Sequence, residues 1–309
     1  MRILISGASG LLGLNLAIQA SSGHAVTGVV HEHVLKGLPF PVLARDLGKP
    51  DAAAALFDEV QPEAVIHCAA MANIDECEAE PERAMRINAD LPGWLAGEAR
   101  RCGVRLIHLS TDAVFDGEKG DYREEDAPNP LGVYARTKLA GERKVLEANP
   151  EALVARVNFY GWSLSGKRSL AEQFYYHLAA GRPMQGFTDV YFCPLLVNQL
   201  AELLIDLAES RLAGLYHLFS PECMSKYKFG IAIARKFGLD ETLIRPTPLT
   251  QSGLKAARSP NLRMCSEKIN LALSRPLPGQ AEGLKGFYQL WAEGYPQRLR
   301  DYGSGPASD

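Results

Sequence analysis

The chain has 309 residues, of which 47% are hydrophobic and 22% charged, and its formal net charge is -3. This length allows one large domain or two modest ones around a substantial core. The weak net charge gives no electrostatic reason to expect nucleic acid or an anionic membrane as a partner, and no apolar run approaches the roughly 20 residues that span a bilayer.

Residues 1–158 alternate short β-branched runs with longer helical patterns. Buried strands are expected at residues 2–6, 25–30, 64–69, 104–110 and 152–157. Helices are expected between them, at residues 11–22, 51–60, 80–102 and 134–149. Such alternation predicts an α/β fold with a Rossmann-type, doubly wound parallel sheet.

After residue 158 the pattern changes to a smaller C-terminal α/β region, which runs to residue 309. Its expected elements are one strand at 215–219 and helices at 168–180, 197–210 and 225–238. We place the domain boundary near residue 158 and expect the segment near 195–220 to fold back onto the first domain. The Pro- and Ser-rich stretch 245–261 is expected to be a loop, and the polar tail 301–309 is expected to fray.

A glycine-rich turn, "ISGASGLLG", joins the first strand to the first helix. The chain must turn sharply at Gly7, approach a pyrophosphate closely at Gly10, and let helix and strand pack at Gly13. The free N–H groups at the helix start then face the anion. A purely structural turn is the alternative, but the strand and helix on either side are the context that the motif requires. We expect dinucleotide contacts from Gly7, Ser9, Gly10, Leu11, Leu12 and Gly13.

The second strand ends in Val30, His31 and Glu32, where the adenosine ribose of a dinucleotide would lie. An NAD enzyme tends to place an acidic side chain there for the 2′-hydroxyl. Val30 cannot bind a hydroxyl, and His31 or Ser9 could approach a 2′-phosphate, whereas Glu32 would repel one. The balance favours NADP as cofactor and leaves NAD open.

Two later segments offer further cofactor contacts. Asp46 could accept a hydrogen bond from the adenine amino group. Small residues in "CAA" (68–70) would leave room for the cofactor across the strand ends, although simple packing explains the alanines equally well. The expected contacts here are Asp46, Leu47, Cys68, Ala69 and Ala70.

Tyr134 and Lys138 lie four residues apart in a helical pattern, so they share one helix face a turn apart. A free tyrosine has a pKa of about 10, too high for efficient proton exchange at neutral pH. We therefore expect the Lys138 ammonium to lower the pKa of Tyr134, and Lys138 also to hold the nicotinamide ribose. Thr111, at the end of its strand, could donate to the same substrate oxygen as Tyr134.

At this point several motifs resemble those of the extended short-chain dehydrogenases/reductases, and most closely the dTDP-4-dehydrorhamnose reductase family. These motifs are the glycine turn, "CAA", "RIN" (86–88), "STDAVFDG" (110–117) and "EEDAPNPLGVYARTKLAGE" (124–142). The resemblance covers most of the first 160 residues and continues more weakly through 214–239 and 258–269.

The resemblance implies an NAD(P)H-dependent reductase of the 4-keto group of a nucleotide-linked deoxysugar. Thr111, Tyr134 and Lys138 would form its catalytic trio, and Tyr134 would protonate the oxygen while hydride passes to the carbonyl carbon. Asn88 would hold the water that links Lys138 to solvent protons; without the family context it is simply a polar residue on a helix.

The expected substrate region departs from the family pattern. The family carries a tryptophan-containing stretch after the sixth strand, where this chain has "RVNFYGW" with Phe159, Tyr160 and Trp162. A later family segment is small and polar, where this chain has "TDVYFCPL" (188–195), with bulky apolar residues that would change the pocket. The expected substrate contacts are Asp112, Phe159, Tyr191 and Arg258, the last as a cation for a diphosphate. Two alternatives stay open: Asp112 could simply cap the turn after its strand, and Arg258 could be a solvated surface charge on a loop.

Two other functions remain open. An epimerase or dehydratase of the same superfamily would use the same trio on another sugar nucleotide. A non-catalytic NADP-binding subunit, like the regulatory subunit of methionine adenosyltransferase, would share the fold but serve a partner enzyme.

The six cysteines show no CxxC pair and no metal-binding spacing, so we expect reduced thiols in a cytoplasmic protein and no metal site. The N-terminus shows no cleavable signal. The helices expected at 80–102 and 134–149 could pair in a homodimer.

Overall fold

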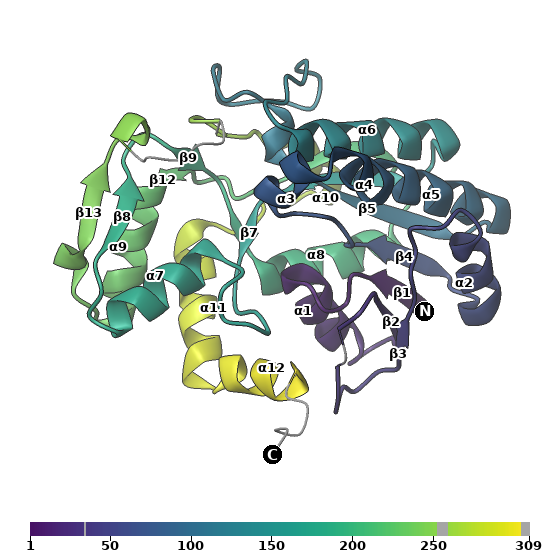
Figure 1. Cartoon of the computed structure of the whole chain (residues 1–309), viewed down its shortest axis with the longest axis horizontal. Coiled ribbons are helices and arrows are strands. Elements are labelled where there is room, and N and C mark those ends of the chain that lie inside the picture. Colours follow the sequence, from purple (N-terminus) through teal and green to yellow (C-terminus); the bar gives the residue numbers. More distant parts are fainter. Residues whose placement is uncertain (34, 252–258, 304–309) are drawn as a thin grey trace.

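A seven-stranded parallel sheet forms the centre of the larger of two lobes (Figure 1). The computed structural model describes residues 1–33, 35–251 and 259–303. The strand order is β11-β6-β5-β4-β1-β2-β3, and every neighbouring pair is parallel. The strands are β1 (Arg2–Ser6), β2 (Ala25–Val30), β3 (Val42–Ala44), β4 (Ala64–His67), β5 (Arg105–Thr111), β6 (Leu153–Val157) and β11 (Gly214–Leu218). The predicted doubly wound α/β fold is confirmed. Because the order reverses between β1 and β4, a crevice for ligands is expected beyond the carboxyl ends of these strands.

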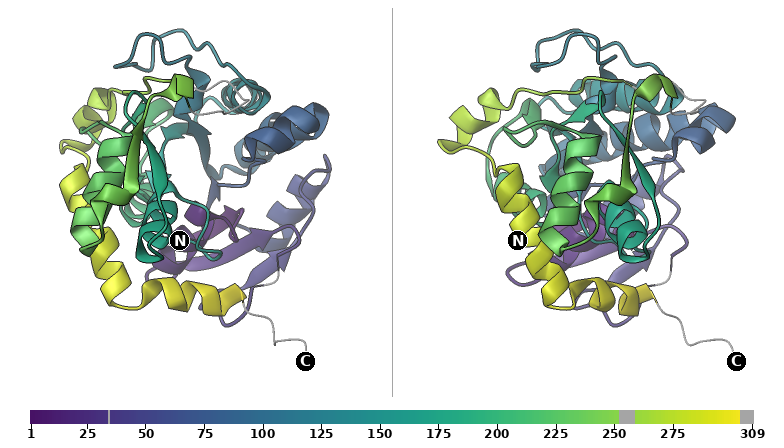
Figure 2. Two further views of the ribbon diagram at one scale, coloured as in Figure 1. Left: turned by 60° about the vertical axis from the view of Figure 1, so that its left-hand side comes forward. Right: turned by 90° about the vertical axis from the view of Figure 1, so that its left-hand side faces the viewer.

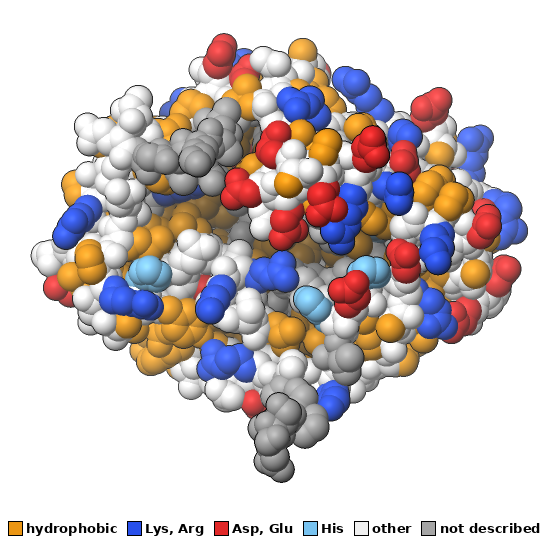
Figure 3. Space-filling model, in the orientation of Figure 1, with side chains coloured by type: hydrophobic (Ala, Val, Ile, Leu, Met, Phe, Trp, Pro, Cys, Tyr) orange, Lys and Arg blue, Asp and Glu red, His pale blue; other side chains and the backbone are white. Residues whose placement is uncertain are grey.

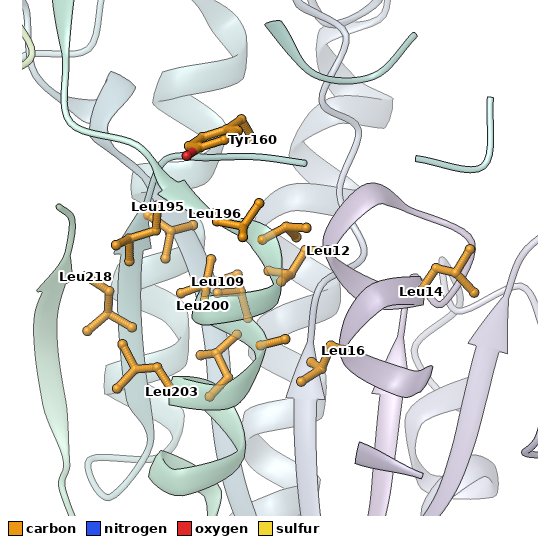
Figure 4. Packing of buried hydrophobic residues seen from close by; sticks show 14 of the residues in the cluster. Leu12, Leu14, Leu16, Leu109, Tyr160, Leu195, Leu196, Leu200, Leu203 and Leu218 are labelled. Carbon is orange, nitrogen blue, oxygen red and sulfur yellow. The ribbon is translucent and has the colours of Figure 1, made fainter. Parts of the chain in front are cut away.

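Helices cover both faces of this sheet. On one face α1 (Leu11–Ala20) packs against α8 (Val197–Glu209), and on the other α5 (Leu91–Cys102) packs against α2 (Ala52–Val60) and α6 (Val133–Ala148). Figure 4 shows leucines of α1 and α8 gathered over Leu109 of β5. Within the described residues, no helix is both long and apolar enough to cross a membrane.

The helix expected at 80–102 is divided into several pieces. α3 (Ile74–Ala79) and α4 (Pro81–Met85) lead into a π-helical turn, Arg86–Asp90, and then into α5. Pro92 has no N–H to donate to the carbonyl of Asn88, four residues before it, which favours an irregular turn at this point. A β-carbon at Gly141 of α6 would collide with that carbonyl, so α6 approaches the π turn closely.

The smaller lobe holds helices and short strands that follow residue 158. Its elements are β8 (Met184–Phe187) paired with β13 (Ile244–Thr247), and the helices α7 (Leu170–Ala179), α9 (Lys226–Phe237), α11 (Gln280–Ala292) and α12 (Tyr295–Gly303). Figure 2 shows this lobe standing beside the sheet. Two short pairs lie between the lobes, namely β7 (Phe159–Tyr160) with β10 (Leu195–Leu196) and β9 (Tyr191–Phe192) with β12 (Met224–Ser225). α10 (Glu267–Leu273) contacts β11.

The chain crosses between the lobes more than once. β11 is a strand of the large sheet and α8 packs on one face of that sheet, although both elements follow β8 and β9 in sequence. A domain boundary near residue 158 stays a prediction.

Two expectations for irregular segments need correction. Part of the stretch 245–261 is not a loop, because β13 reaches Thr247. Pro246 is tolerated there because, among the described residues, β13 pairs with β8 alone and is an edge strand. Residues 301–303 are not frayed, because they end α12, whose Leu299 is buried and whose Tyr302 carbonyl accepts from the Lys36 N–H. Residues 252–258 and 304–309 lie outside the described residues.

Cys193 and Cys223 form a disulfide, which corrects the expectation that all six cysteines are reduced. They are 30 residues apart, and their segments meet because β9 and β12 pair antiparallel beside them. Sequence spacing could not show this, since the contact arises from the tertiary fold. The free cysteines are Cys68, Cys77, Cys102 and Cys265.

Replacing Cys223 by Ser, or reducing the protein, is expected to lower the free energy of unfolding by roughly 2–4 kcal/mol, because the cross-link restricts the unfolded chain. Urea unfolding with and without reductant measures the effect. The exposed Cys102→Ser variant is the control and should unfold like the parent protein. Thiol titration of the denatured protein should give four thiols before reduction; six would contradict the disulfide.

Candidate active site

The glycine turn after β1 has no space for a side chain at Gly7 or at Gly13. Gly7 has a φ of +71°, and a β-carbon there would lie 2.7 Å from the backbone nitrogen of Ala69. A β-carbon at Gly13 would collide with the Gly7 carbonyl. Gly10 is the N-cap of α1 and makes no side-chain cap, so the first N–H groups of the helix stay available for an anion. This cradle fits the pyrophosphate of a dinucleotide, and the close approach of the backbone after β4 explains why Gly7 carries no side chain.

The end of β2 carries more negative than positive charge. The His31 ring lies 3.4 Å from the Glu32 carboxylate and 3.8 Å from that of Asp46. Asp46 also accepts from the Gly48 N–H at 2.9 Å. The side chains of Leu12 and Leu47 are buried in the core, so a cofactor would meet only their backbone.

Thr111, Tyr134 and Lys138 meet where β5 ends and α6 begins. The hydroxyl of Tyr134, the second residue of α6, lies near the Thr111 hydroxyl at the end of β5. The buried Lys138 ammonium donates to the Leu109 carbonyl at 2.6 Å. α6 therefore presents both side chains to the carboxyl end of β5, as the four-residue spacing predicts.

The expected lowering of the Tyr134 pKa is wrong for this arrangement. Burial raises the pKa of Tyr134 to about 12, and the nearby Thr111 hydroxyl only partly opposes this. Lys138 does not offset the burial because its ammonium is turned to the Leu109 carbonyl. Burial also lowers the pKa of Lys138 to about 8, while the carboxylate of Glu142 acts in the opposite direction.

Glu142 extends the contact of α6 with the sheet by one more turn. Its carboxylate accepts from the Ser110 hydroxyl of β5. Arg156 of β6 binds both carboxylate oxygens, at 2.8 and 2.7 Å, and both side chains are almost fully buried. Such bidentate geometry satisfies two charges that would be costly to bury singly.

Asn88 lies in the π turn, with its side chain buried and fully engaged. Its amide oxygen accepts from the Met71 N–H at 2.9 Å, and its amide nitrogen donates to the Met71 carbonyl and to the Thr137 hydroxyl. Thr137 in turn donates to the Tyr134 carbonyl at 2.9 Å. These bonds hold α6 in place; a proton relay through Asn88 stays a prediction.

Asp112 lies beside the Thr111–Tyr134 pair. Its carboxylate accepts from Thr111 at 3.1 Å and from the Asn158 amide at 2.6 Å. Burial raises the Asp112 pKa, and these hydrogen bonds together with Lys226 act in the opposite direction. Sequence reasoning missed Asn158; its signal was a polar residue directly after the buried strand β6, at the edge where ligands bind.

Two buried histidines stack near Lys138, with ring centroids 5.3 Å apart. His67 of β4 contacts the Ser6 hydroxyl at 2.6 Å, whereas both ring nitrogens of His108 of β5 have no hydrogen-bond partner among the described residues. Burial, reinforced by Lys138, lowers the pKa of His67 to about 3 and that of His108 well below its ordinary value. Burial also raises the pKa of the nearby Cys68 thiol to about 12.

The surface is hollowed between the two lobes, and apolar side chains show inside the hollow (Figure 3). Phe159 and Tyr191 are half-buried on the short strands between the lobes, and Arg263 lies over the Tyr191 ring at 5.8 Å. Ala70 is exposed past β4. Arg258 lies outside the described residues. The structure thus brings Thr111, Tyr134, Lys138 and Asp112 together directly.

The aromatic residues after β6 mostly do not face this hollow. Trp162 is fully buried, stacks on Phe287 at 4.1 Å and donates to the Phe287 carbonyl. Tyr160 is buried beside Phe229 and Phe287. The bulky residues expected to reshape the pocket, Phe192, Cys193 and Leu195, are likewise buried in the core. In the described part of the chain no cluster of three or more metal-ligating side chains occurs.

A family model for the RmlD substrate binding domain matches residues 1–292. The probable low-salt glycan biosynthesis reductase Agl14 of Haloferax volcanii is 34% identical over 276 residues, which cover 88% of this chain and 91% of that protein. The dTDP-4-dehydrorhamnose reductase of Mycobacterium tuberculosis H37Rv is 34% identical over 284 residues, 89% of this chain and 88% of that protein. Subunit beta of methionine adenosyltransferase 2 from Bos taurus is 33% identical over 288 residues, 90% of this chain and 84% of that protein.

Among solved structures, dTDP-4-dehydrorhamnose reductase from Bacillus anthracis in complex with NADP is similar in fold. Its TM-score is 0.83 at 24% identity, and the match covers 93% of this chain and 98% of that one.

His108→Leu is expected to change how stability depends on pH. Because the folded pKa lies well below the unfolded value of about 6.5, the unfolded chain binds more protons, and stability falls as the pH falls below about 6.5. Between pH 7 and pH 5 the variant should therefore lose about 2 kcal/mol less stability than the parent protein. Urea unfolding at both pH values tests this. The exposed His33→Leu variant is the control, and equal pH dependence in His108→Leu and parent would refute the effect.

Proposed function

The chain belongs to the RmlD substrate-binding-domain family, and on that premise we propose that it is an NAD(P)H-dependent reductase of the 4-keto group of a nucleotide-linked deoxysugar. The observation that carries the proposal is the meeting of three side chains: Tyr134 lies beside Thr111, and Lys138 follows one helical turn later. Two of the relatives are reductases by name, which supports an oxidoreductase.

The cofactor is NADP, with NAD as the other option, and the glycine cradle would hold its pyrophosphate. When bound, the nicotinamide supplies the hydride. The residues that we assign to cofactor binding are Gly7, Ser9, Gly10, Leu11, Leu12, Gly13, His31, Asp46, Leu47, Cys68, Ala69, Ala70, Tyr134 and Lys138. The carboxylates of Glu32 and Asp46 lie near His31 and would repel the 2′-phosphate of NADP, so this group fits the proposed cofactor site least well.

Tyr134 donates its proton to the carbonyl oxygen, Thr111 orients that oxygen, and Lys138 holds the nicotinamide ribose. A phenol with a pKa of about 12 is protonated at neutral pH, but it is a weak acid for the transfer of that proton. An epimerase or dehydratase of the same superfamily begins by removing a proton from a hydroxyl. The two relatives that are reductases by name favour the reductase over these functions.

The substrate is a nucleotide sugar that enters between the lobes. Asp112 is assigned to the sugar, because its buried carboxylate lies next to the Thr111 hydroxyl. Phe159 and Tyr191 are assigned to the walls of the same site, since both lie on the short strands between the lobes. We keep Arg258 as the expected cation for the diphosphate.

A second candidate function is that of a subunit of methionine adenosyltransferase, which the identity of 33% to a subunit beta favours. The intact trio favours the enzyme instead. If the parent protein turned over no ketosugar nucleotide but changed the activity of methionine adenosyltransferase on mixing, the subunit function would replace the reductase.

We also propose that the protein works in the cytoplasm, where nucleotide sugars are reduced by cofactors of this class. The expected cytoplasmic location rested in part on six reduced cysteines. The Cys193–Cys223 disulfide removes that support, because disulfides are rare in the cytosol. A homodimer through α5 and α6 stays a prediction.

Tyr134→Phe is expected to lower turnover of a 4-ketosugar nucleotide by about 10²–10⁴-fold, because the phenylalanine has no proton to donate. Nicotinamide absorbance follows turnover, and fluorescence titration should show NADPH affinity within about twofold of the parent protein. Tyr176→Phe, in α7 of the smaller lobe, is the control. Full turnover in Tyr134→Phe would remove its catalytic role.

The rate of reduction is expected to fall as the pH rises through about 8, because Lys138 then loses the charge that holds the ribose. The measurement is kcat/KM for the cofactor between pH 6 and pH 10. Lys138→Met should lose most activity, while Lys144→Met, which removes an exposed pair with Asp90, should keep the parent profile. A profile that stays flat to pH 10 would contradict the assignment.

A further inference from the structure

Helix α6 begins without a cap of its own. Its N-cap residue, Gly132, has no side chain that could accept from the first N–H groups of the helix. Glu78 of α3 supplies the acceptor instead: its Oε1 atom accepts from the Val133 N–H at 2.7 Å. A β-carbon at Gly132 would lie 2.9 Å from the same oxygen, so the glycine lets the carboxylate approach. A carboxylate at a helix start is also favoured by the helix dipole.

α3 contacts the catalytic tyrosine as well. Cys77, next to Glu78, is buried in a small apolar cluster against which Val133 and Tyr134 pack. The Cys77 thiol donates to the Met71 carbonyl at 3.2 Å. The start of α3 is itself fixed, because the Asn73 side chain accepts from the N–H groups of Asp75 and Glu76. The amino-terminal end of α3 is therefore held by its own side-chain cap.

The other side of Tyr134 is fixed by different bonds. The Asn88 amide donates to Thr137, and Thr137 donates to the Tyr134 carbonyl. These two bonds fix the first turn of α6 from its carboxyl side, whereas Glu78 fixes it from the amino side. The Tyr134 hydroxyl must stay within hydrogen-bond reach of Thr111, so both supports act on the same small distance.

We propose that Glu78 is a positioning residue for the reduction: its carboxylate holds the first turn of α6 and so keeps the Tyr134 hydroxyl at Thr111. This inference rests on the proposed function for its effect on turnover. The hold on α6 does not depend on that function. Glu78 touches neither the glycine cradle nor Lys138 in the described contacts, so most of the assigned cofactor contacts do not depend on it.

Two variants of Glu78 and one control variant test whether the hydrogen-bond acceptor or the negative charge of its side chain holds α6. Glu78→Ala removes the hydrogen-bond acceptor, whereas Glu78→Gln keeps an accepting oxygen at that position. Glu80→Ala is the control. It removes a neighbouring exposed carboxylate that, among the described contacts, forms an ion pair with Arg83 alone. The measurements are kcat and KM with a 4-ketosugar nucleotide, NADPH affinity, and amide hydrogen exchange of a peptide covering residues 131–139.

Glu78→Ala should lower kcat by about five- to tenfold, with NADPH affinity within about twofold, and should speed exchange in the first turn of α6 by about fivefold. Glu78→Gln should restore most of the kcat and the slow exchange, and Glu80→Ala should match the parent protein. Unchanged exchange in Glu78→Ala would overturn the proposal, as would unchanged kcat in an active protein or equal losses in the two Glu78 variants. If the parent protein has no turnover, the reductase function fails, and hydrogen exchange still decides whether Glu78 holds the helix.

Discussion

Helix α6 is bound to strand β5 at three successive turns, and the candidate site depends on this attachment. Tyr134 meets Thr111, Lys138 meets the Leu109 carbonyl, and Glu142 meets Ser110. The spacing of four residues matches one helical turn, so three side chains of one face reach three neighbouring positions of the strand. The pair of Glu142 with Arg156 anchors the third of these turns, because separating two buried charges would leave each without a partner.

Much of the fold and of the reactive trio follows from the sequence. Alternating apolar runs and helical patterns give the strands of the large sheet, and the glycine spacing gives the cradle. Lys138 and Tyr134 share a face because the helix repeat requires it. These features are local, or they depend on the general rule that ligands meet parallel strands at their carboxyl ends.

Other features depend on burial and on contacts between distant segments, which spacing alone does not carry. The pKa of Tyr134 rises because neighbouring elements exclude water from its phenol, and nothing in Y-x-x-x-K records that exclusion. Trp162 has the size of a sugar-binding residue, yet it fills the core of the smaller lobe. Cys193 and Cys223 meet only because β9 and β12 pair. The acceptor at the start of α6 comes from a helix more than fifty residues earlier.

Asn158 is the single residue between β6, which ends in the sheet, and β7, which begins the passage to the smaller lobe. Its side chain holds Asp112, and its carbonyl accepts from the Leu195 N–H. Asn158 therefore ties the start of β10 to Asp112, so a substitution at this one position changes both the joint between two strand pairs and the surroundings of Thr111.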